Sequence, residues 1–335
     1  MTKGLIDSNE LTKLMSPQNY SGIILIDGKH VSVKEKHLVE ICFIDYLTHD
    51  IPVHITAFSE NMEDIETGFR LLKEMKYPLI VVVCDESMGE IATVAKKIFP
   101  GVIIQHCLTH YSRNVERTFV LNRAKISIKA LERQLREMGD SFLFQTHHHD
   151  VEKARNIVNE IAQLEYEYDY LIRVNGYFQE IFWKAKNEDD INRLEDELNE
   201  AIAMMNLYQY PHAERIKKRY LDYYEKRDRL IAFTKYPHMD IPKTTNLIEG
   251  FNSTTLELRL SSIRGFEKEE HARNYLNALI LKRRFQKFTD CKGKFKHLNG
   301  RSPLQISNPL HTFNFNFRGH DWIQFCSKLR KETQK

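Results

Sequence analysis

The sequence predicts an α/β protein in which a mixed sheet is interrupted by an all-α insertion. Five apolar runs of strand length come before residue 106, and long stretches rich in Glu, Lys, Arg, Leu and Tyr follow them. Two further helical segments come after Pro242. Closely spaced strands followed by βαβ units are typical of a mixed sheet with helices on both faces.

The strands are expected to form an antiparallel meander and then two βαβ units. The first strand is expected to end at Asp27, and Gly28 is expected to turn the chain. The continuous apolar run before Asp85 is typical of a strand buried on both faces. The expected strands span residues 22–27, 38–47, 52–58, 79–85 and 102–105.

Helical periodicity accounts for most of the remaining chain. Ser59 is expected to cap the first helix after the meander. Before the insertion a helix is expected over 90–99, within it over 124–138, 150–170, 188–205 and 213–233, and after it over 243–260 and 268–288. The tail from Gly293 is expected to be irregular, with alternating Phe313, Phe315 and Phe317 forming a short strand or an extended clasp.

These patterns divide the chain into five segments. They are an N-terminal arm (1–20), the first part of the sheet core (21–112), the α-helical insertion (113–240), a segment with two helices (241–300) and a C-terminal tail (301–335). Residues 147–149 are three adjacent histidines within the insertion. They form either a metal site or a solvated loop. Three adjacent residues rarely point at one ion.

Composition bounds the class of protein. The formal net charge of +3 does not name a partner, and five scattered cysteines favour reduced thiols in a cytosolic protein. No signal peptide and no membrane-length apolar run are recognisable, so we expect a soluble protein with no membrane partner.

Three acids are the candidate catalytic residues. Asp27 and Asp85 follow apolar strands, and Glu249 lies on a later helix. Ligands bind outside the carboxyl ends of strands in open α/β sheets, and two-metal phosphoryl transfer needs converging carboxylates. Mg²⁺ and Mn²⁺ prefer such oxygen ligands. The pattern therefore favours a divalent-metal site.

Each acid also has a structural interpretation. Asp27-Gly28 is common hairpin chemistry, Asp85 is placed to cap the next helix, and Asn246 with Glu249 has capping-box spacing. Three rival acids lie nearby in the sequence: Asp45, Glu86 and Glu90. Of these, Asp45 on the second strand is the reserve candidate.

Four segments together resemble the DDE-type transposases of the bacterial insertion-sequence and Mutator-like superfamily. They are Ile24-Leu-Ile-Asp-Gly-Lys-His30, Val83-Cys-Asp-Glu86, Gln105-His-Cys-Leu-Thr-His110 and Thr244-Thr-Asn-Leu-Ile-Glu-Gly-Phe-Asn252. The resemblance covers roughly residues 20–300. It implies a ribonuclease-H-like core, split by the insertion, in which Asp27, Asp85 and Glu249 bind Mg²⁺, with Mn²⁺ as a substitute.

The same resemblance implies supporting roles for four more residues. Cys107 and His110 match a Cys-x-x-His pair, which is either half a zinc site or a packing and DNA-positioning element. Asn246 and Asn252 lie three positions on either side of Glu249, so on one helix face they are placed to orient its carboxylate or touch the scissile phosphate.

A basic segment follows the third acid. Residues 259–301 hold 12 Lys and Arg against four acids, with phenylalanines interleaved. This composition favours contact with DNA phosphates, and the alternative is a solvated helix face over aromatic core residues. The candidate contacts are Arg259, Arg264, Lys282, Arg283 and Arg284.

The resemblance implies metal-dependent DNA cleavage and strand transfer for an insertion sequence. The implied partners are the DNA of element ends and target, and further copies of the chain in a homo-oligomer. Only about 20 residues precede the first strand, too few for the N-terminal DNA-reading module that such transposases usually carry. Three explanations stay open: a truncated copy, one product of a split reading frame with a separate DNA-reading module, or a variant that reads DNA through its insertion. The implied location is the cytoplasm, in association with the nucleoid. Two alternatives stay open: an inactive or domesticated DNA-binding relic, and a structure-specific nuclease without strand transfer.

Overall fold

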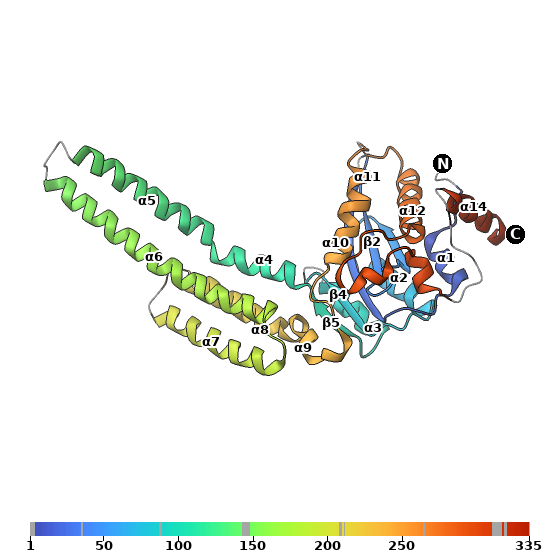
Figure 1. The fold of residues 1–335 in the computed structure, drawn as a ribbon, viewed down its shortest axis with the longest axis horizontal. Helices are drawn as coiled ribbons and strands as arrows, with labels where there is room; N and C mark the ends of the chain where they lie inside the picture. Colours follow the sequence, from blue (N-terminus) through green and yellow to red (C-terminus); the bar gives the residue numbers. More distant parts are fainter. Residues whose placement is uncertain are drawn as a thin grey trace. The chain divides into compact units, whose positions relative to one another are not determined.

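The chain folds as two units, seen in a computed structural model that describes residues 4–334 apart from 35, 87–88, 143–147, 208–209, 211, 264, 310–316 and 318–319. The sheet unit combines Met1–Cys107 with Asp240–Lys335, and the helical unit is Leu108–Met239. Figure 1 labels the elements of both.

A five-stranded mixed sheet with the order β3-β2-β1-β4-β5 forms the centre of the sheet unit. Neighbouring strands are antiparallel from β3 to β1 and parallel from β1 to β5, so the expected α/β class, mixed sheet and meander are confirmed. The strands are β1 (Ile23–Val33), β2 (Lys36–Asp45), β3 (Val53–Ala57), β4 (Val81–Cys84) and β5 (Ile103–His106).

The prediction that Gly28 turns the chain is wrong. Strand β1 continues through Gly28, which pairs with Ile41, and ends at Val33. Gly28 is needed there for another reason, because a Cβ at this position would lie 2.0 Å from Oε1 of Glu60. A glycine inside a strand often marks such a close approach by another group.

Helices α2 (Met62–Glu74) and α3 (Gly89–Ile98) bury their apolar sides in one core with the sheet. Ile26 and Phe43 from the strands pack with Phe69 in this core, and all three are nearly or fully inaccessible. The cap of α2 is Asn61 rather than the expected Ser59, because the Asn61 side chain accepts a hydrogen bond from Asp64 N.

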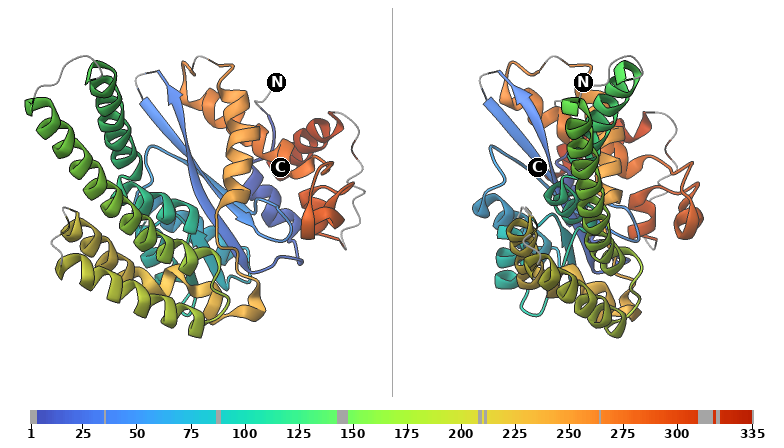
Figure 2. Two further views of the ribbon diagram at one scale, coloured as in Figure 1. Left: turned by 60° about the vertical axis from the view of Figure 1, so that its left-hand side comes forward. Right: turned by 90° about the vertical axis from the view of Figure 1, so that its left-hand side faces the viewer.

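One continuous helix follows the insertion and contacts β1. It comprises α10 (Asn246–Phe251), a π-helical stretch η2 (Asn252–Glu257) and α11 (Leu258–Leu260). Figure 2 shows it running alongside the long β1–β2 hairpin. A π-helix holds an extra residue in its turn and is frequent at functional sites. The helix α12 (Glu269–Phe285) comes next.

The two ends of the sequence form one small core. The apolar residues of α1 (Ser8–Met15), α12, α13 (Pro303–Ser307) and α14 (Asp321–Thr333) pack together there. The expectation of an irregular tail is therefore wrong for α13 and α14, and the short helix η3 (Gly293–Leu298) precedes them. Phe317 packs edge-on against Phe285, while Phe313 and Phe315 lie outside the described residues.

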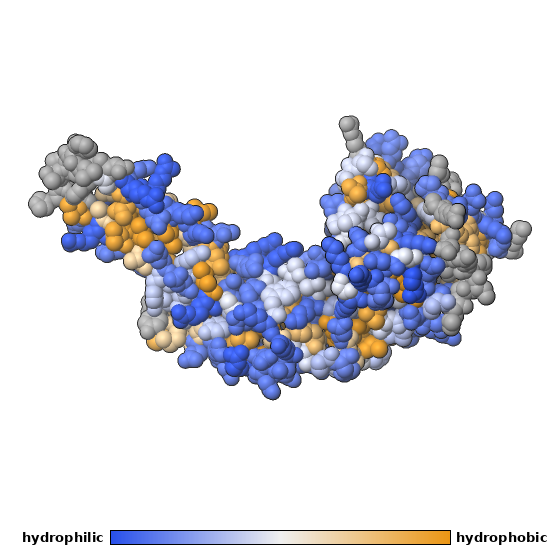
Figure 3. All heavy atoms as spheres, viewed as in Figure 1, coloured by the Kyte–Doolittle hydropathy of each residue, from blue (hydrophilic) through white to orange (hydrophobic). Residues whose placement is uncertain are grey.

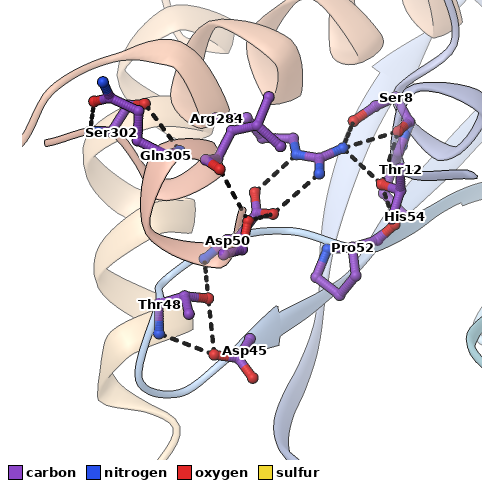
Figure 4. Close-up of polar contacts among 12 residues, drawn as sticks. Ser8, Thr12, Asp45, Thr48, Asp50, Pro52, His54, Arg284, Ser302 and Gln305 are labelled. Carbon is purple, nitrogen blue, oxygen red and sulfur yellow. Dashed lines mark hydrogen bonds and ion pairs between the residues drawn. The ribbon is translucent and has the colours of Figure 1, made fainter. Parts of the chain in front are cut away.

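A buried ion pair holds these terminal elements to the sheet (Figure 4). Arg284 donates to Asp50 from Nε at 2.8 Å and Nη2 at 3.0 Å, and neither side chain is exposed. Its Nη1 donates to Thr12 Oγ1 at 2.8 Å and to the carbonyl of Ser8 at 2.9 Å. Ser307 donates to the same carboxylate of Asp50. One guanidinium thus links α1, α12 and α13 with the β2–β3 turn.

The helical unit contains helices only among its described residues. They are α4 (Leu108–Phe119), α5 (Leu121–Phe142), α6 (His148–Trp183), α7 (Glu188–Leu207), α8 (Ala213–Leu230), α9 (Ala232–Lys235) and the 3₁₀ turn η1 (Pro237–Met239). Its core combines aliphatic side chains with aromatic rings, among which Tyr111 meets Phe182 edge-on and Phe178 meets Tyr223.

Helices α5 and α6 carry exposed apolar side chains, among them Ile126 and Val158. Figure 3 shows apolar patches in orange on one face of the molecule. His147 lies outside the described residues, as do the side chains of His148 and His149, so the histidine triplet stays a prediction. No helix in the described part of the chain has the length and apolar character required to cross a membrane.

Candidate active site

The parallel pairing of β1 with β4 positions the first two acids. Leu25 pairs with Val83 across the two strands. Asp27 comes two residues after Leu25 within β1, and Asp85 comes two residues after Val83, just past the end of β4. The expected neighbourhood of the first and fourth strands is confirmed. Asp27 is half-buried within β1, and Asp85 directly follows β4.

A hydrogen bond joins the third-acid helix to the first acid. Asn252 Nδ2 donates to Asp27 Oδ2 at 2.8 Å, across 225 positions of sequence. Asn252 is only 6% exposed, and its Oδ1 is buried without a hydrogen-bond partner among the described residues. A second link lies further along the same helix, where Lys29 pairs with Glu257 at 3.0 Å. These contacts fix the helix across β1.

A second set of contacts fixes Glu249 from the other side. Thr245, one turn earlier, donates from Oγ1 to Glu249 Oε1 at 2.7 Å. The same hydroxyl lies 3.1 Å from Cys107 Sγ, and the backbone N–H of Thr245 donates to that sulfur at 3.3 Å. Cys107 N in turn donates to Cys84 O, the residue before Asp85. Short contacts therefore connect the end of β4 with Glu249.

Cys107 offers a further ligand beside the carboxylate of Glu249. A carboxylate oxygen of Glu249 lies within 4.8 Å of Cys107 Sγ, and both residues belong to the sheet unit. A thiolate and a carboxylate are ligands that zinc accepts, and the pairing of Cys107 with His110 in such a site stays a prediction. Among the described residues, Asp27 and Asp85 belong to no close group of three such ligand atoms.

Glu60 is an acid at this end of the sheet that the sequence analysis missed. Its Oε1 lies against Gly28, the residue after Asp27. Burial raises the pKa of Glu60, the charge of Asp85 raises it further, and His30 opposes the shift. No strand-end or spacing pattern marks Glu60, because it lies in the irregular segment between β3 and α2. The available signal is the following Asn61 cap, which places residue 60 beside a helix start.

Asp45 has a structural role instead of the reserve role expected for it. It pairs with Ile24, three residues before Asp27 along β1. Its buried carboxylate accepts hydrogen bonds from the hydroxyls of Ser21, Thr48 and Tyr77. These hydrogen bonds use the carboxylate oxygens to hold the surrounding turn in place.

The structure places the other candidates differently from one another. Asn246 begins α10 and is exposed, with no side-chain contact to Glu249 among those found for the described residues. Arg259 is exposed on α11, Lys282 is half-buried, and Arg283 stacks over Phe288 at 4.7 Å from the ring centroid.

The expectation that Arg284 contacts DNA is wrong for this structure, because its guanidinium is fully buried on Asp50. Arg264 lies outside the described residues.

No protein-family model matches the chain, and no curated protein matches it. The fold and the site define a general class. The chain is an α/β protein in which a later helix crosses the first strand of a mixed sheet and hydrogen-bonds to Asp27.

Proposed function

We propose that this chain is a metal-dependent DNA strand-cleaving and strand-transfer enzyme of the DDE transposase type. The four-segment resemblance supports this proposal, and so does a mixed sheet in which the strands of Asp27 and Asp85 are neighbours. In the proposal the sheet is a ribonuclease-H-like core, and the helical unit is the insertion between the second and third acids.

One observation carries the proposal. The hydrogen bond from Asn252 to Asp27 brings a helix from beyond the insertion onto the first strand. In the proposal Glu249, three residues from Asn252 on that helix, lies with the two aspartates at this edge of the sheet. A structural capping role for Glu249 gives no reason for this long-range contact.

The side chains fit a hard divalent cation. Asp27, Asp85 and Glu249 supply carboxylate oxygens, and the buried Oδ1 of Asn252 is an amide oxygen without a hydrogen bond among the described residues. Oxygen ligands of this kind suit Mg²⁺ and Mn²⁺. When bound, such an ion would polarise the scissile phosphate and lower the pKa of an attacking water or 3′-hydroxyl.

The protein's own part in the reaction is to hold ligands and substrate in place. Thr245 restrains Glu249, and Asn252 restrains Asp27, so both carboxylates are oriented before substrate binds. Preorganised positioning and electrostatics supply most of the catalysis in phosphoryl transfer. The proposed substrate is duplex DNA, and assembly into a homo-oligomer with a separate DNA-reading module remains part of the proposal.

Nicking of supercoiled plasmid in Mg²⁺ or Mn²⁺ tests the function. Glu249→Gln, Asp27→Asn and Asp85→Asn are expected to lower the nicking rate about a hundredfold or more while DNA binding persists. Glu267→Gln is the matched control, because Glu267 is an exposed acid in the segment between α11 and α12.

Each outcome is informative. Wild-type nicking by Glu249→Gln would exclude the proposed role of that acid. A wild-type protein that binds DNA but never cuts it in either metal would instead be a DNA-binding relic. Cleavage without joined products would identify a nuclease without strand transfer. The same nicking assay in Zn²⁺ reports whether Cys107 and Glu249 select a softer ion than magnesium.

A further inference from the structure

A basic cavity lies within the helical unit, apart from the residues of the proposed site. It has a volume of about 440 Å³ and is formed by α4 and α8. Four of its seven lining residues are cationic and one is acidic: Asn114, Arg117, Thr118, Arg215, Lys218, Arg219 and Asp222. Both walls belong to one unit, so the cavity is a local feature of that unit.

The base of the cavity is a fixed polar network. Arg219 donates to Asp222 at 2.9 Å and to Thr118 on the facing helix at 3.2 Å, and its guanidinium lies over the buried ring of Tyr111. Lys226 also pairs with Asp222, at 2.7 Å. Burial raises the pKa of Asp222, but hydrogen bonds from Lys226 and Tyr111 and the charges of Lys226 and Arg219 lower it below its ordinary value. The only acid in the lining is therefore neutralised from inside the protein.

Three cations of the lining are left for an external partner. Arg117, Arg215 and Lys218 are exposed, and no carboxylate of the described residues lies within ion-pair distance of them. Arg215 and Lys218 are one turn apart on α8, which aligns them along the helix axis. Elsewhere in the unit, exposed arginines such as Arg193 have intrahelical acid partners.

Charge is separated between neighbouring helices of the unit. Helix α8 carries seven Lys and Arg against four acids, whereas α7 carries seven acids against one arginine. Positive charge is thus concentrated beside the cavity rather than spread evenly. An open row of unpaired cations on two helices suits a polyanion with regularly repeated charges, because each charge then meets its own phosphate.

We propose that this α4–α8 cavity binds the phosphate backbone of duplex DNA. The inference rests on the proposed function for its choice of DNA as the polyanion. The residues that contact phosphates are Arg117, Arg215 and Lys218. Arg219, which its hydrogen bonds hold in place, supplies a fixed positive charge at the bottom of the cavity. Contacts of this kind position DNA without reading its sequence.

Fluorescence anisotropy with a labelled DNA duplex, in EDTA and over a series of salt concentrations, tests the inference. In the double variant Arg215→Ala/Lys218→Ala, the slope of log K against log salt is expected to fall by about 2. Affinity at about 0.1 M salt is expected to fall at least roughly tenfold, since each phosphate contact contributes nearly one decade there.

The control is Lys125→Ala/Lys129→Ala, which removes the same charge from exposed positions on α5. It is expected to leave slope and affinity nearly unchanged. The charge-keeping variant Arg215→Lys/Lys218→Arg is expected to retain the slope, which separates charge from shape. Circular dichroism melting checks that every variant is folded.

An unchanged slope in the double variant would overturn the inference, as would a wild-type protein that binds no DNA. Loss of RNA or tripolyphosphate binding with DNA binding intact would overturn it as well. A protein that binds DNA through these residues but never nicks it would leave the inference standing and reject the proposed function. Nicking by the wild-type protein, together with an unchanged salt slope in the double variant, would leave the proposed function standing and reject the inference.

Discussion

Arg284 and Asp50 form a bidentate ion pair in which neither side chain reaches solvent, although 234 positions separate them. A pair of this kind does not add much stability relative to an apolar substitute, because both charges must be desolvated. Breaking it is costly, since one charge is then left buried without a partner. The pair therefore couples folding of the C-terminal helices to that of the sheet.

Arg284→Met is expected to lower the free energy of unfolding by about 3–5 kcal/mol, because Asp50 remains as an uncompensated buried charge. Urea denaturation monitored by circular dichroism measures this. The exposed Arg301 gives the matched control, Arg301→Met, which is expected to change stability by less than about 0.5 kcal/mol. The double variant Arg284→Met/Asp50→Leu is expected to recover part of the loss. A loss as small as the control's would contradict the structural role of the pair.

His49 is expected to make the protein acid-sensitive. Burial, with help from the charges of Arg283 and His297, lowers the pKa of His49 from 6.5 to about 3. Between these two pKa values His49 is protonated in the unfolded chain but not in the folded chain. Its contribution to the free energy of unfolding is therefore fully present above pH 6.5 and is lost as pH falls towards 3. The expected slope is at most about 1.4 kcal/mol per pH unit.

The variant His49→Phe retains a ring against Phe288 and Phe295 and is expected to flatten this part of the stability profile. His320→Phe, at an exposed position, is expected to leave the profile as it is. The urea concentration at the midpoint of unfolding, measured for each variant at a series of pH values, tests both expectations. Parallel profiles for wild type and His49→Phe would show that His49 is not the titrating group.

Gly28→Ala is expected to displace the carboxylate of Glu60, because the new Cβ would lie 2.0 Å from its Oε1. The obstacle is the end of a flexible side chain, so the loss of stability is expected to be modest, about 1–2 kcal/mol. Gly28→Ala in a Glu60→Ala background removes the clash with Glu60 and leaves Val39 Cγ1 at 3.0 Å from the new Cβ. A double-mutant cycle by thermal or urea unfolding measures the coupling. Additive effects of the two substitutions would show that the close approach does not constrain position 28.

Asn252→Ala tests the contact that carries the proposed function. The variant removes the donor to Asp27, and loss of such a supporting contact typically lowers metal affinity or activity by about 10–100-fold. Plasmid nicking as a function of Mg²⁺ concentration measures both effects. Asn246→Ala is the control, since Asn246 is exposed on the same helix. Equal nicking by the two variants would show that the Asn252–Asp27 bond does not support the site.

The predicted sheet followed from short-range patterns. Apolar runs before Asp27 and Asp85 marked β1 and β4, and their spacing gave the meander and the α/β class. Gly28 was misinterpreted because Asp-Gly is a hairpin signal, whereas here a distant side chain, Glu60, determines the residue type. The length of β1 depends on its pairing with β2, which a local pattern does not reveal.

Long-range contacts also explain what was missed at the site. No local pattern distinguishes Arg284 from its neighbours in the basic run, because its burial depends on Asp50 and on α1. The cores formed by α13 and α14 need partners from the start of the chain. The cations of α4 and α8 lie about a hundred positions apart, so their shared cavity was equally hidden.

The helix that crosses β1 is interrupted by the π-helical stretch Asn252–Glu257. This stretch determines how far the residues after it are rotated about the helix axis relative to the residues before it. An α-helix advances about 100° per residue, and deleting one residue within the widened turn would restore that regular advance. The exposed Arg259 would then be rotated around the axis relative to Glu249, with composition almost unchanged. Single-residue length changes in this turn are therefore expected to separate the acid from the basic surface without unfolding either.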